Sequence, residues 1–386
     1  MGAFVAFLLI LLVVAVTLRI DFFFTIVYLF AGVYVLSRFW SQRIKKSLHV
    51  QRTFIDHVFS GDTASVDLVI GNTGWLPIPW IVATESVSPE LSPPLSSELL
   101  RLRGNEQRHI PYSFTCRRRG YYPLGPLKVA TGDLLGIMPR ITQQLDQQFL
   151  TVYPKIVPLE HLGLPTRSPL AVLPSRSPLF EDTSRIMGVR SYQPGDSQRR
   201  IHWTASANAG ELLVKRYQPA IARETLICLD LNSDHYTQRY GSTELAIIVA
   251  ASIAYHVIVR ERQAVGLATE AIIPASGIQR FSLSPRQKRA HLTQILEVLA
   301  RVQTTPGIPF LELLRREQAR LAWGATMTII TGREDQGLLD MLIGLRRVGF
   351  AVALILVQPE RPLDVPKPRG TTIYRVWNEQ DVEASL

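Results

Sequence analysis

The sequence predicts three structural parts in chain order: a membrane α-hairpin, a β-sandwich, and an α/β domain with an open, mostly parallel sheet. Three observations support this prediction. Two apolar runs stand at the N-terminus, residues 47–150 combine alternating patterns with many prolines, and strand patterns alternate with helix patterns beyond residue 223. Such alternation is typical of a parallel sheet covered by helices. With 386 residues, the chain is also long enough for more than one domain.

The N-terminal region predicts a two-helix transmembrane hairpin over residues 1–46. Residues 3–18 carry no charge, and a second apolar run covers residues 22–36. Each run is near the lower limit of the roughly 17–25 residues that a spanning helix needs. A cleavable signal peptide is the alternative. It is less favoured because no Lys or Arg precedes the first run, no small-residue cleavage pattern follows it, and a second run comes at once.

Basic residues directly after the second run predict the orientation. The positive-inside rule places this flank in the cytoplasm. We therefore expect a multi-pass protein of the cell membrane whose soluble part faces the cytoplasm. The two cysteines form no Cys-x-x-Cys pair, which argues against a cysteine zinc site and against a disulfide framework. The basic flank consists of Arg38, Arg43, Lys45 and Lys46.

The formal net charge of +10 allows several classes of partner. Nucleic acid, anionic lipid and acidic proteins all attract a basic chain. The positive residues are spread over the membrane flank, the β-region and residues 188–222, without a row of aromatic residues on which bases could stack. The sequence therefore predicts no nucleic-acid partner.

Residues 47–150 predict the β-sandwich. Strand patterns cover residues 50–59, 64–71 and 108–116, and Asn72-Thr73-Gly74 predicts a turn. Prolines between positions 77 and 94 exclude a helix there. Short strands at this spacing are typical of a sandwich. Residues 151–187 are rich in Pro and Ser, which predicts a connector between domains.

Residues 223–386 predict the α/β domain. The first strand, Thr225–Leu231, is continuously apolar, as expected for a strand buried on both faces. Further strands are expected at residues 264–269, 326–331, 351–357 and 371–376, and helices at 242–260, 286–301, 310–322 and 336–348.

Residues 188–222 form a segment dense in specific residue types. Pro194-Gly195 predicts a turn, Asp196 is expected to cap a helix of about three turns, and Gly210 is expected to end it in the left-handed conformation. Two interpretations are open: the arginines clamp two domains by pairing with local carboxylates, or they stay exposed and bind a partner. The candidate residues are Arg190, Tyr192, Asp196, Arg199, Arg200, His202 and Trp203.

A hydrolytic site built on this segment is a weaker alternative. His202 and Ser206 would share one helix face, with Asp196 nearby. A serine nucleophile needs an exposed hydroxyl, an oxyanion hole and a base held by a third group. One short helix supplies these poorly, and Ser206 lies in no Gly-x-Ser-x-Gly elbow.

A candidate metal site follows the first strand of the α/β domain. Asp230, Asn232 and Asp234 stand where open α/β sheets bind ligands, at the carboxyl end of a strand. Their oxygen atoms could hold Mg²⁺. Alternatively, Asn232 and Asp234 only turn the chain. The chain contains no phosphate-binding loop, dinucleotide fingerprint or His-Glu-x-x-His motif.

Three sequence blocks resemble the DUF58 family. They are Arg119–Pro126 followed by Gly132–Gly136, then Arg190–Asp196 with Arg200–Trp203 and Ser206-Ala207, and the strand that ends at Asp230. The resemblance implies a C-terminal domain similar to von Willebrand factor type A domains, which hold a cation with an Asp-x-Ser-x-Ser motif plus a Thr and an Asp from other loops. Here Asn232 and Asp234 replace the serines, and Thr331-Gly332-Arg333 stands where Asp-Gly is expected.

The resemblance also implies a function. Genes of this family often neighbour those of MoxR-type AAA+ ATPases, which implies a membrane-anchored, non-enzymatic adaptor that helps such an ATPase to assemble or activate other proteins. The segment at 188–222 and the α/β domain would dock this partner. The alternatives are a module that binds proteins through a divalent cation at Asp230, and a hydrolase that uses Asp196 and His202.

Overall fold

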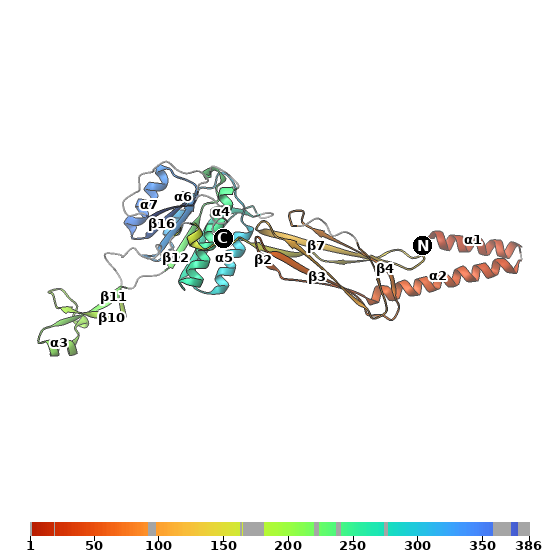
Figure 1. Ribbon diagram of the computed structural model, residues 1–386, viewed down its shortest axis with the longest axis horizontal. Coiled ribbons are helices and arrows are strands. Elements are labelled where there is room, and N and C mark those ends of the chain that lie inside the picture. Colours follow the sequence, from red (N-terminus) through yellow and green to blue (C-terminus); the bar gives the residue numbers. More distant parts are fainter. Residues whose placement is uncertain are drawn as a thin grey trace. The chain divides into compact units, whose positions relative to one another are not determined.

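The computed structural model describes residues 2–18, 20–91, 98–162, 164, 181–219, 224–236, 241–273, 277–357 and 372–376. The chain divides into two compact units, Met1–Pro154 and Lys155–Leu386 (Figure 1). Residues 163 and 165–180 of the predicted connector at 151–187 lie outside the described ranges.

The first unit begins with two apolar helices, α1 (Gly2–Leu18) and α2 (Asp21–Ser47). They pack as a hairpin through aromatic side chains: the rings of Phe4 and Tyr34 stack with their centroids 5.8 Å apart. The N-terminal apolar helices are therefore confirmed. In the described part of the chain, two helices are long and apolar enough to cross a membrane, Asp21–Ser47 and Gly241–Arg260. The apolar window of the first is only 11% buried, whereas that of the second is 78% buried, as in the core helix of a soluble domain.

Two β-sheets follow the hairpin in the same unit. Their pairs are antiparallel except for β2 with β9, which is parallel. The first sheet has the order β1 (Leu48–Phe54), β3 (Thr63–Asn72), β6 (Gln107–Thr115). The second has the order β2 (His57–Phe59), β9 (Gln148–Tyr153), β7 (Gly120–Thr131), β4 (Ile78–Val87), β5 (Glu98–Leu102), and β8 (Ile141–Leu145) also pairs with β7.

The two sheets enclose a shared apolar core. Along β3, alternate side chains are buried, including Leu68 and Ile70, and these pack in one cluster with Ile81 of β4 and Leu127 of β7. The period of two places one face of each strand in this core. Ile44 in the last turns of α2 belongs to the same cluster and is 1% exposed. The C-terminal end of α2 is therefore packed into the sandwich core.

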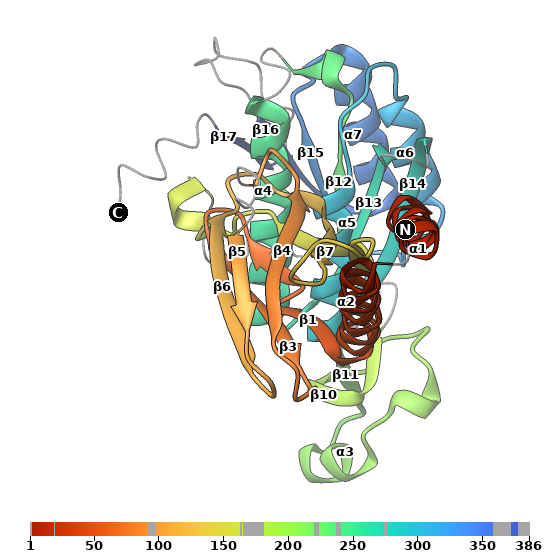
Figure 2. The same ribbon diagram turned by 90° about the vertical axis from the view of Figure 1, so that its right-hand side faces the viewer.

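The second unit contains a six-stranded sheet covered by helices on both faces. The strand order is β14-β13-β12-β15-β16-β17, and all neighbours are parallel except the edge strand β14, which pairs antiparallel with β13 (Figure 2). Figure 1 shows α6 and α7 on one side of this sheet and α4 and α5 on the other. The strands are β12 (Glu224–Leu229), β13 (Ala264–Ile273), β14 (Gly277–Arg286), β15 (Thr326–Thr331), β16 (Ala351–Val357) and β17 (Thr372–Val376). The helices are α4 (Gly241–Tyr255), α5 (Arg289–Arg301), α6 (Phe310–Gln318) and α7 (Gln336–Val348), and a π-helical turn at His256–Arg260 extends α4.

Several elements differ from the sequence-based expectations. The single strand expected at 50–59 is two strands, because β1 pairs with β3 of one sheet and β2 with β9 of the other, so the chain changes sheets between them. Strand β14 was not predicted, and helix α5 therefore begins at Arg289 rather than at Arg286. Strand β10 (Glu181–Ser191) was also not predicted and occupies the end of the expected connector.

Candidate functional site

The segment singled out by the sequence folds into a small hairpin. Strand β10 pairs antiparallel with β11 (Leu213–Pro219) in a two-stranded sheet of its own. The chain between the two strands carries helix α3 (Trp203–Ala209). The backbone N–H of Tyr192 donates to the carbonyl of Leu212 (2.8 Å), which closes the base of this excursion. We call residues 181–219 the signature hairpin.

The predicted three-turn helix from Asp196 is wrong. A short 3-10 turn covers Gln198–Arg200, and α3 begins only at Trp203, with His202 as its N-cap. Between them, Ile201 pairs with Val214 of β11 in an isolated antiparallel bridge and is 6% exposed. Burying this side chain against β11 takes the backbone out of the helical conformation. Gly210 ends α3 with φ of 70°, as expected for a left-handed C-cap.

Asp196 is instead held by Arg190. The two guanidinium nitrogens Nη1 and Nη2 donate to Oδ2 and Oδ1 of Asp196, each at 2.6 Å. The backbone N–H of Gln193 donates to the same carboxylate at 3.0 Å. A bidentate Arg–carboxylate pair fixes geometry as well as charge. Both partners lie within the signature hairpin, so this pair orders the turn at Pro194-Gly195 and does not bridge two domains.

We expect the carboxyl group of Asp196 to stay ionised far into the acid range. The hydrogen bonds from Arg190, and then that from the Gln193 amide, lower its pKa to about 2. The ordinary Asp value is about 3.9. Because the folded pKa is the lower one, the stabilisation is present above the ordinary value and is lost as pH falls through about 2. A carboxyl carbon NMR titration should place the Asp196 midpoint near that value, and Arg190→Gln should return it toward the ordinary range. An ordinary midpoint in the native chain would contradict the pair.

His202 and Ser206 are also engaged in structure. His202 Nδ1 accepts a hydrogen bond from the Ala205 N–H at 3.2 Å. Ser206 Oγ donates to the His202 carbonyl at 3.0 Å and accepts from the Leu213 N–H at 2.8 Å, and Ser206 is 8% exposed. These bonds tie α3 to β11. They do not provide the exposed nucleophile and oriented base that a hydrolase needs, so the geometry does not favour that alternative.

The outer surface of the signature hairpin combines apolar and basic side chains. Trp203 is 67% exposed and Leu212 is 47% exposed. Arg199 and Arg200 are exposed as well, and Tyr192 is half-buried. The hairpin thus brings together all seven residues predicted for this site, with Asp196 turned to Arg190 and His202 turned to the backbone. Ile186 and Val189 of β10, each exposed, extend the apolar part and were missed because β10 was not predicted.

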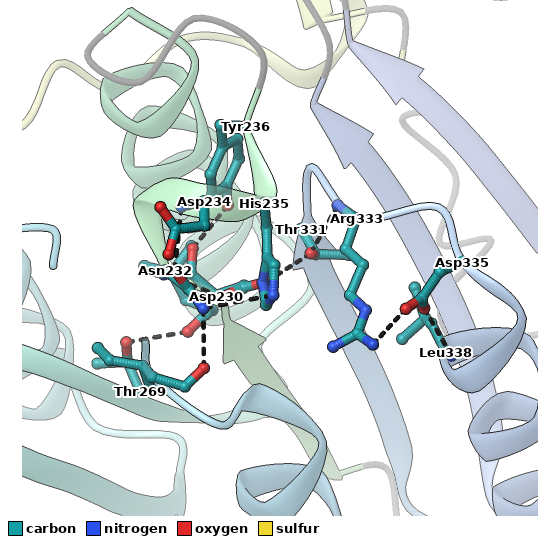
Figure 3. Close-up of polar contacts among 12 residues, drawn as sticks. Asp230, Asn232, Asp234, His235, Tyr236, Thr269, Thr331, Arg333, Asp335 and Leu338 are labelled. Atoms are coloured by element: carbon teal, nitrogen blue, oxygen red, sulfur yellow. Dashed lines mark hydrogen bonds and ion pairs between the residues drawn. The ribbon is translucent and has the colours of Figure 1, made fainter. Parts of the chain in front are cut away.

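A second polar cluster lies at the carboxyl end of the parallel sheet (Figure 3). Asp230 directly follows β12 and is fully buried. Its Oδ1 accepts a hydrogen bond from the Asn232 N–H at 3.0 Å. Its Oδ2 accepts from the Thr331 hydroxyl at 2.6 Å and lies 2.6 Å from His235 Nδ1. Thr331 is the last residue of β15, the neighbour of β12, so the strand order brings these side chains together.

The side-chain amide of Asn232 indicates which ring nitrogen of His235 carries the proton. Asn232 Nδ2 donates to the carbonyl of Ile308 at 3.0 Å, and its Oδ1 accepts from the Asp234 N–H at 3.0 Å. The same Nδ2 lies 3.3 Å from His235 Nε2. Because Nδ2 is a donor, we assign Nε2 as the acceptor and place the imidazole proton on Nδ1, where it is donated to Asp230. Sequence reasoning missed His235, whose only signal was its position in the loop after Asp230.

Arg333 occupies the loop where the family resemblance leads one to expect an acidic residue. It forms a close ion pair with Asp335, which also caps α7 by accepting from the Leu338 N–H at 3.0 Å. The hydrogen bond with Asp335 raises the pKa of Arg333, and the charge of Asp230 raises it further. The same bond lowers the pKa of Asp335. The surroundings of Asp230 therefore include the guanidinium of Arg333, and Thr331 stands at the position where the resemblance implies a carboxylate.

The hydrogen bonds around Asp230 do not match the oxygen ligand set of the Mg²⁺ site predicted at Asp230, Asn232 and Asp234. Within the described ranges, no group of three or more His, Cys, Asp or Glu side chains is placed to hold a metal ion. Both oxygens of Asp230 already accept hydrogen bonds, and the side-chain oxygen of Asn232 accepts from the Asp234 backbone. Magnesium needs a near-octahedral set of oxygen ligands. The cluster is built as a set of protein hydrogen bonds, with His235 and Thr331 as donors to the carboxylate.

Comparisons with known proteins support the family but reveal no activity. Residues 188–366 match the family described as "Protein of unknown function DUF58". The "Uncharacterized protein YeaD" of Bacillus subtilis (strain 168) is 22% identical over 279 residues, which cover 71% of this chain and 65% of that protein, just under two thirds of its length.

Similarity to solved structures is weak. The CARDB domain of the PF1109 protein from Pyrococcus furiosus has a TM-score of 0.23 at 14% identity and covers 28% of this chain and 94% of its own. Native alpha-2-macroglobulin from Escherichia coli has a TM-score of 0.24 at 18% identity and covers 28% of this chain and 16% of its own. Similarities of this size support no argument about function. The match of residues 188–366 to the family model, together with the Bacillus relative, supports a DUF58 family protein.

Proposed function

We propose that this chain is a membrane-anchored, non-enzymatic interaction protein and that the signature hairpin is its docking element for a protein partner. The observation that carries the proposal is Trp203, which is 67% exposed at the start of α3 in a hairpin that forms a sheet of its own. Tryptophan and arginine are the residue types most enriched among those that dominate binding energy at protein interfaces.

The rest of the hairpin has the chemistry of such an interface. Leu212 adds exposed apolar area, and the exposed Arg199 and Arg200 add positive charge to the same hairpin. The Arg190–Asp196 pair holds the turn in one conformation, which lowers the entropic cost of binding. A complementary partner would offer an apolar pocket with an acidic rim. The family resemblance suggests a MoxR-type AAA+ ATPase as this partner.

The helices and the sheet support the remaining parts of the proposal. The apolar window of α2 is mostly unburied, and basic residues follow its apolar part, which supports a membrane-spanning hairpin with the soluble part in the cytoplasm. The mostly parallel sheet with Asp230 at its carboxyl end supports a relation to von Willebrand factor type A domains. In this chain, hydrogen bonds from His235 and Thr331 replace the cation expected there.

The docking role is tested by measuring binding of a purified MoxR-type ATPase from the same organism to the full chain in lipid nanodiscs. Trp203→Ala should weaken binding about 30-fold, which corresponds to the roughly 2 kcal/mol that defines an interface hot spot. Ile278→Ala is the matched control, because Ile278 is 65% exposed on β14, outside the hairpin. An equal loss in both variants, or no loss for Trp203→Ala, would contradict docking through the hairpin. Absence of binding by the native chain would contradict this partner.

A further inference from the structure

Two loops of the β-sandwich are hydrogen-bonded to α2. Ser37 of α2 donates its hydroxyl to Asp133 Oδ2 at 2.5 Å, in the loop between β7 and β8. Three residues further along α2, Trp40 Nε1 donates to the carbonyl of Pro77 at 3.2 Å, in the loop between β3 and β4. Ser37 is 6% exposed and Asp133 is 4% exposed, so the first contact is buried. Both loops are therefore held beside α2 at residues 37–40.

This level of α2 is where its apolar run ends. With a rise of about 1.5 Å per residue, the helix from Asp21 to Trp40 is roughly 30 Å long, the thickness of a bilayer's hydrocarbon core. The stacking of Phe4 on Tyr34 places the start of α1 near the same level, whereas α2 continues beyond it to Ser47. Arg38 and Arg43 begin the basic flank. In the membrane-spanning arrangement, Ser37 and Trp40 lie at the cytoplasmic headgroup boundary.

The tips of the two loops expose large apolar side chains. Leu134 is 76% exposed and Leu135 is 63% exposed, directly after Asp133. Trp75 is 69% exposed, two residues before Pro77. Tryptophan is enriched at membrane interfaces because its ring is apolar and its N–H is polar.

The loop that carries Leu134 and Leu135 is tightly constructed. The carboxylate of Asp133 accepts hydrogen bonds from the backbone N–H groups of Ile137 at 3.0 Å and Met138 at 3.1 Å. Gly136 has φ of +69°, a conformation that favours glycine. The Asp133 carbonyl also accepts a hydrogen bond from Trp80 Nε1 at 3.3 Å. This turn presents its two leucines in a fixed position, which is the property expected of a binding surface rather than of a loosely held loop.

We propose that Trp75, Leu134 and Leu135 form a collar that inserts into the headgroup region of the same bilayer that the helical hairpin spans. The inference rests on the membrane anchoring proposed above. The occupant is a phospholipid surface because both loops are bonded to α2 at the level where its apolar run gives way to basic residues. The exposed Arg140 stacks over the Trp80 ring, 6.0 Å from its centroid, and adds a positive charge beside the collar for anionic headgroups. The collar would hold the sandwich against the membrane.

The test places one fluorescent probe at a time on the full chain in vesicles of phosphatidylcholine and phosphatidylglycerol. Leu134→Cys carries an environment-sensitive nitrobenzoxadiazole label, and the two native cysteines are buried and give little labelling of the folded chain. Thr115→Cys is the control, since Thr115 is exposed and lies at the far end of the first sheet from α2. It pairs with Thr63 at the start of β3, whereas the other end of β3, at Asn72, pairs with Leu48, the residue that follows α2. Leu29→Cys, at a 64% exposed position in α2, reports on the span itself.

Lipids that carry a nitroxide in the headgroup region should quench the probe at position 134 several-fold more than the probe at position 115. Quenching at position 29 by nitroxide in the acyl chains, with no quenching at position 134, would overturn the collar and leave the membrane anchor standing. No quenching at either position would overturn both. Quenching at position 134 should fall strongly when Leu135→Asn and Trp75→Ser are added, because these exposed residues contribute to insertion but not to the core. Unchanged quenching in that variant would overturn the assignment of the collar residues.

Discussion

Replacing Glu85 with Gln is expected to destabilise the β-sandwich by about 3–5 kcal/mol, because it leaves the guanidinium of Arg52 buried without its counter-charge. The side chains of Arg52 and Glu85 are 0% and 1% exposed and form a close ion pair between the two sheets. Arg52 also donates to Gln148 Oε1 and to the Asp146 carbonyl, each at 2.9 Å. Each of the three guanidinium nitrogens of Arg52 thus donates a hydrogen bond to an acceptor in the second sheet or its loops.

The other oxygen of Glu85 is also used. It accepts a hydrogen bond from the hydroxyl group of Tyr112 on β6. Burial, together with this hydrogen bond, raises the pKa of Tyr112 above its ordinary value. The tyrosine therefore remains a neutral donor over the whole physiological range. Glu85 of the second sheet is therefore bonded to two strands of the first sheet, through Arg52 on β1 and Tyr112 on β6.

Native-state hydrogen exchange of the full chain measures the effect, because it gives the free energy of opening for amides of β1 and β4 separately from the α/β unit. The control is Asp56→Asn in the exposed Asp56–His57 pair, whose side chains are 81% and 57% exposed and which should show no resolvable change. The double variant Arg52→Met with Glu85→Leu should recover most of the loss, since it removes both charges. If the β1 and β4 amides of Glu85→Gln exchanged as slowly as those of the native chain, the Arg52–Glu85 pair would not stabilise the sandwich.

Two threonines on one strand should respond oppositely to the same substitution. Thr331→Val is expected to destabilise the α/β unit by about 1–3 kcal/mol, because it removes a hydroxyl that donates to the buried carboxylate of Asp230. Thr328→Val is expected to be neutral or stabilising. Both residues are on β15 and 0% exposed, but Thr328 Oγ1 has no hydrogen-bond partner in the part of the chain that the structure describes. Valine has nearly the same shape as threonine and the same preference for strands.

Hydrogen exchange of β12 and β15 amides separates the two outcomes. Opening free energies should fall in Thr331→Val and stay constant or rise in Thr328→Val. The comparison isolates the hydrogen bonds of the Thr331 hydroxyl, which donates to Asp230 and accepts from the Arg333 N–H at 3.0 Å, because strand, burial and change of volume are matched. Equal losses in the two variants would mean that the hydroxyl bond to Asp230 contributes nothing beyond packing, and the polar cluster would lose its structural role.

Local patterns predicted much of the fold because they act over a few neighbouring residues. The apolar runs predicted the N-terminal helices, and the period of the α/β region predicted β15, α7 and β16 within a residue or two. Strand β14 was missed because its first four residues, Gly277–Arg280, are exposed and carry no apolar period. The helix expected from Asp196 failed because Arg190, on the preceding strand β10, binds its carboxylate, and because Ile201 is buried against β11. A preference for an N-cap is small compared with these tertiary contacts.

The residue types of both candidate sites were visible in the sequence, whereas their partners were decided by the tertiary structure. The sequence by itself determined that Arg190 and Asp196 would lie close together, because they are only six residues apart along the chain. It did not determine that Asp230 meets Thr331, which is 101 residues away. That contact follows from β12 and β15 being adjacent parallel strands in register, with Leu229 opposite Ile330. Hydrophobic period encodes which face of a strand is buried but not which strand lies beside it. The hydrogen-bond partners of Asp230 were therefore decided by strand order and by the placement of His235.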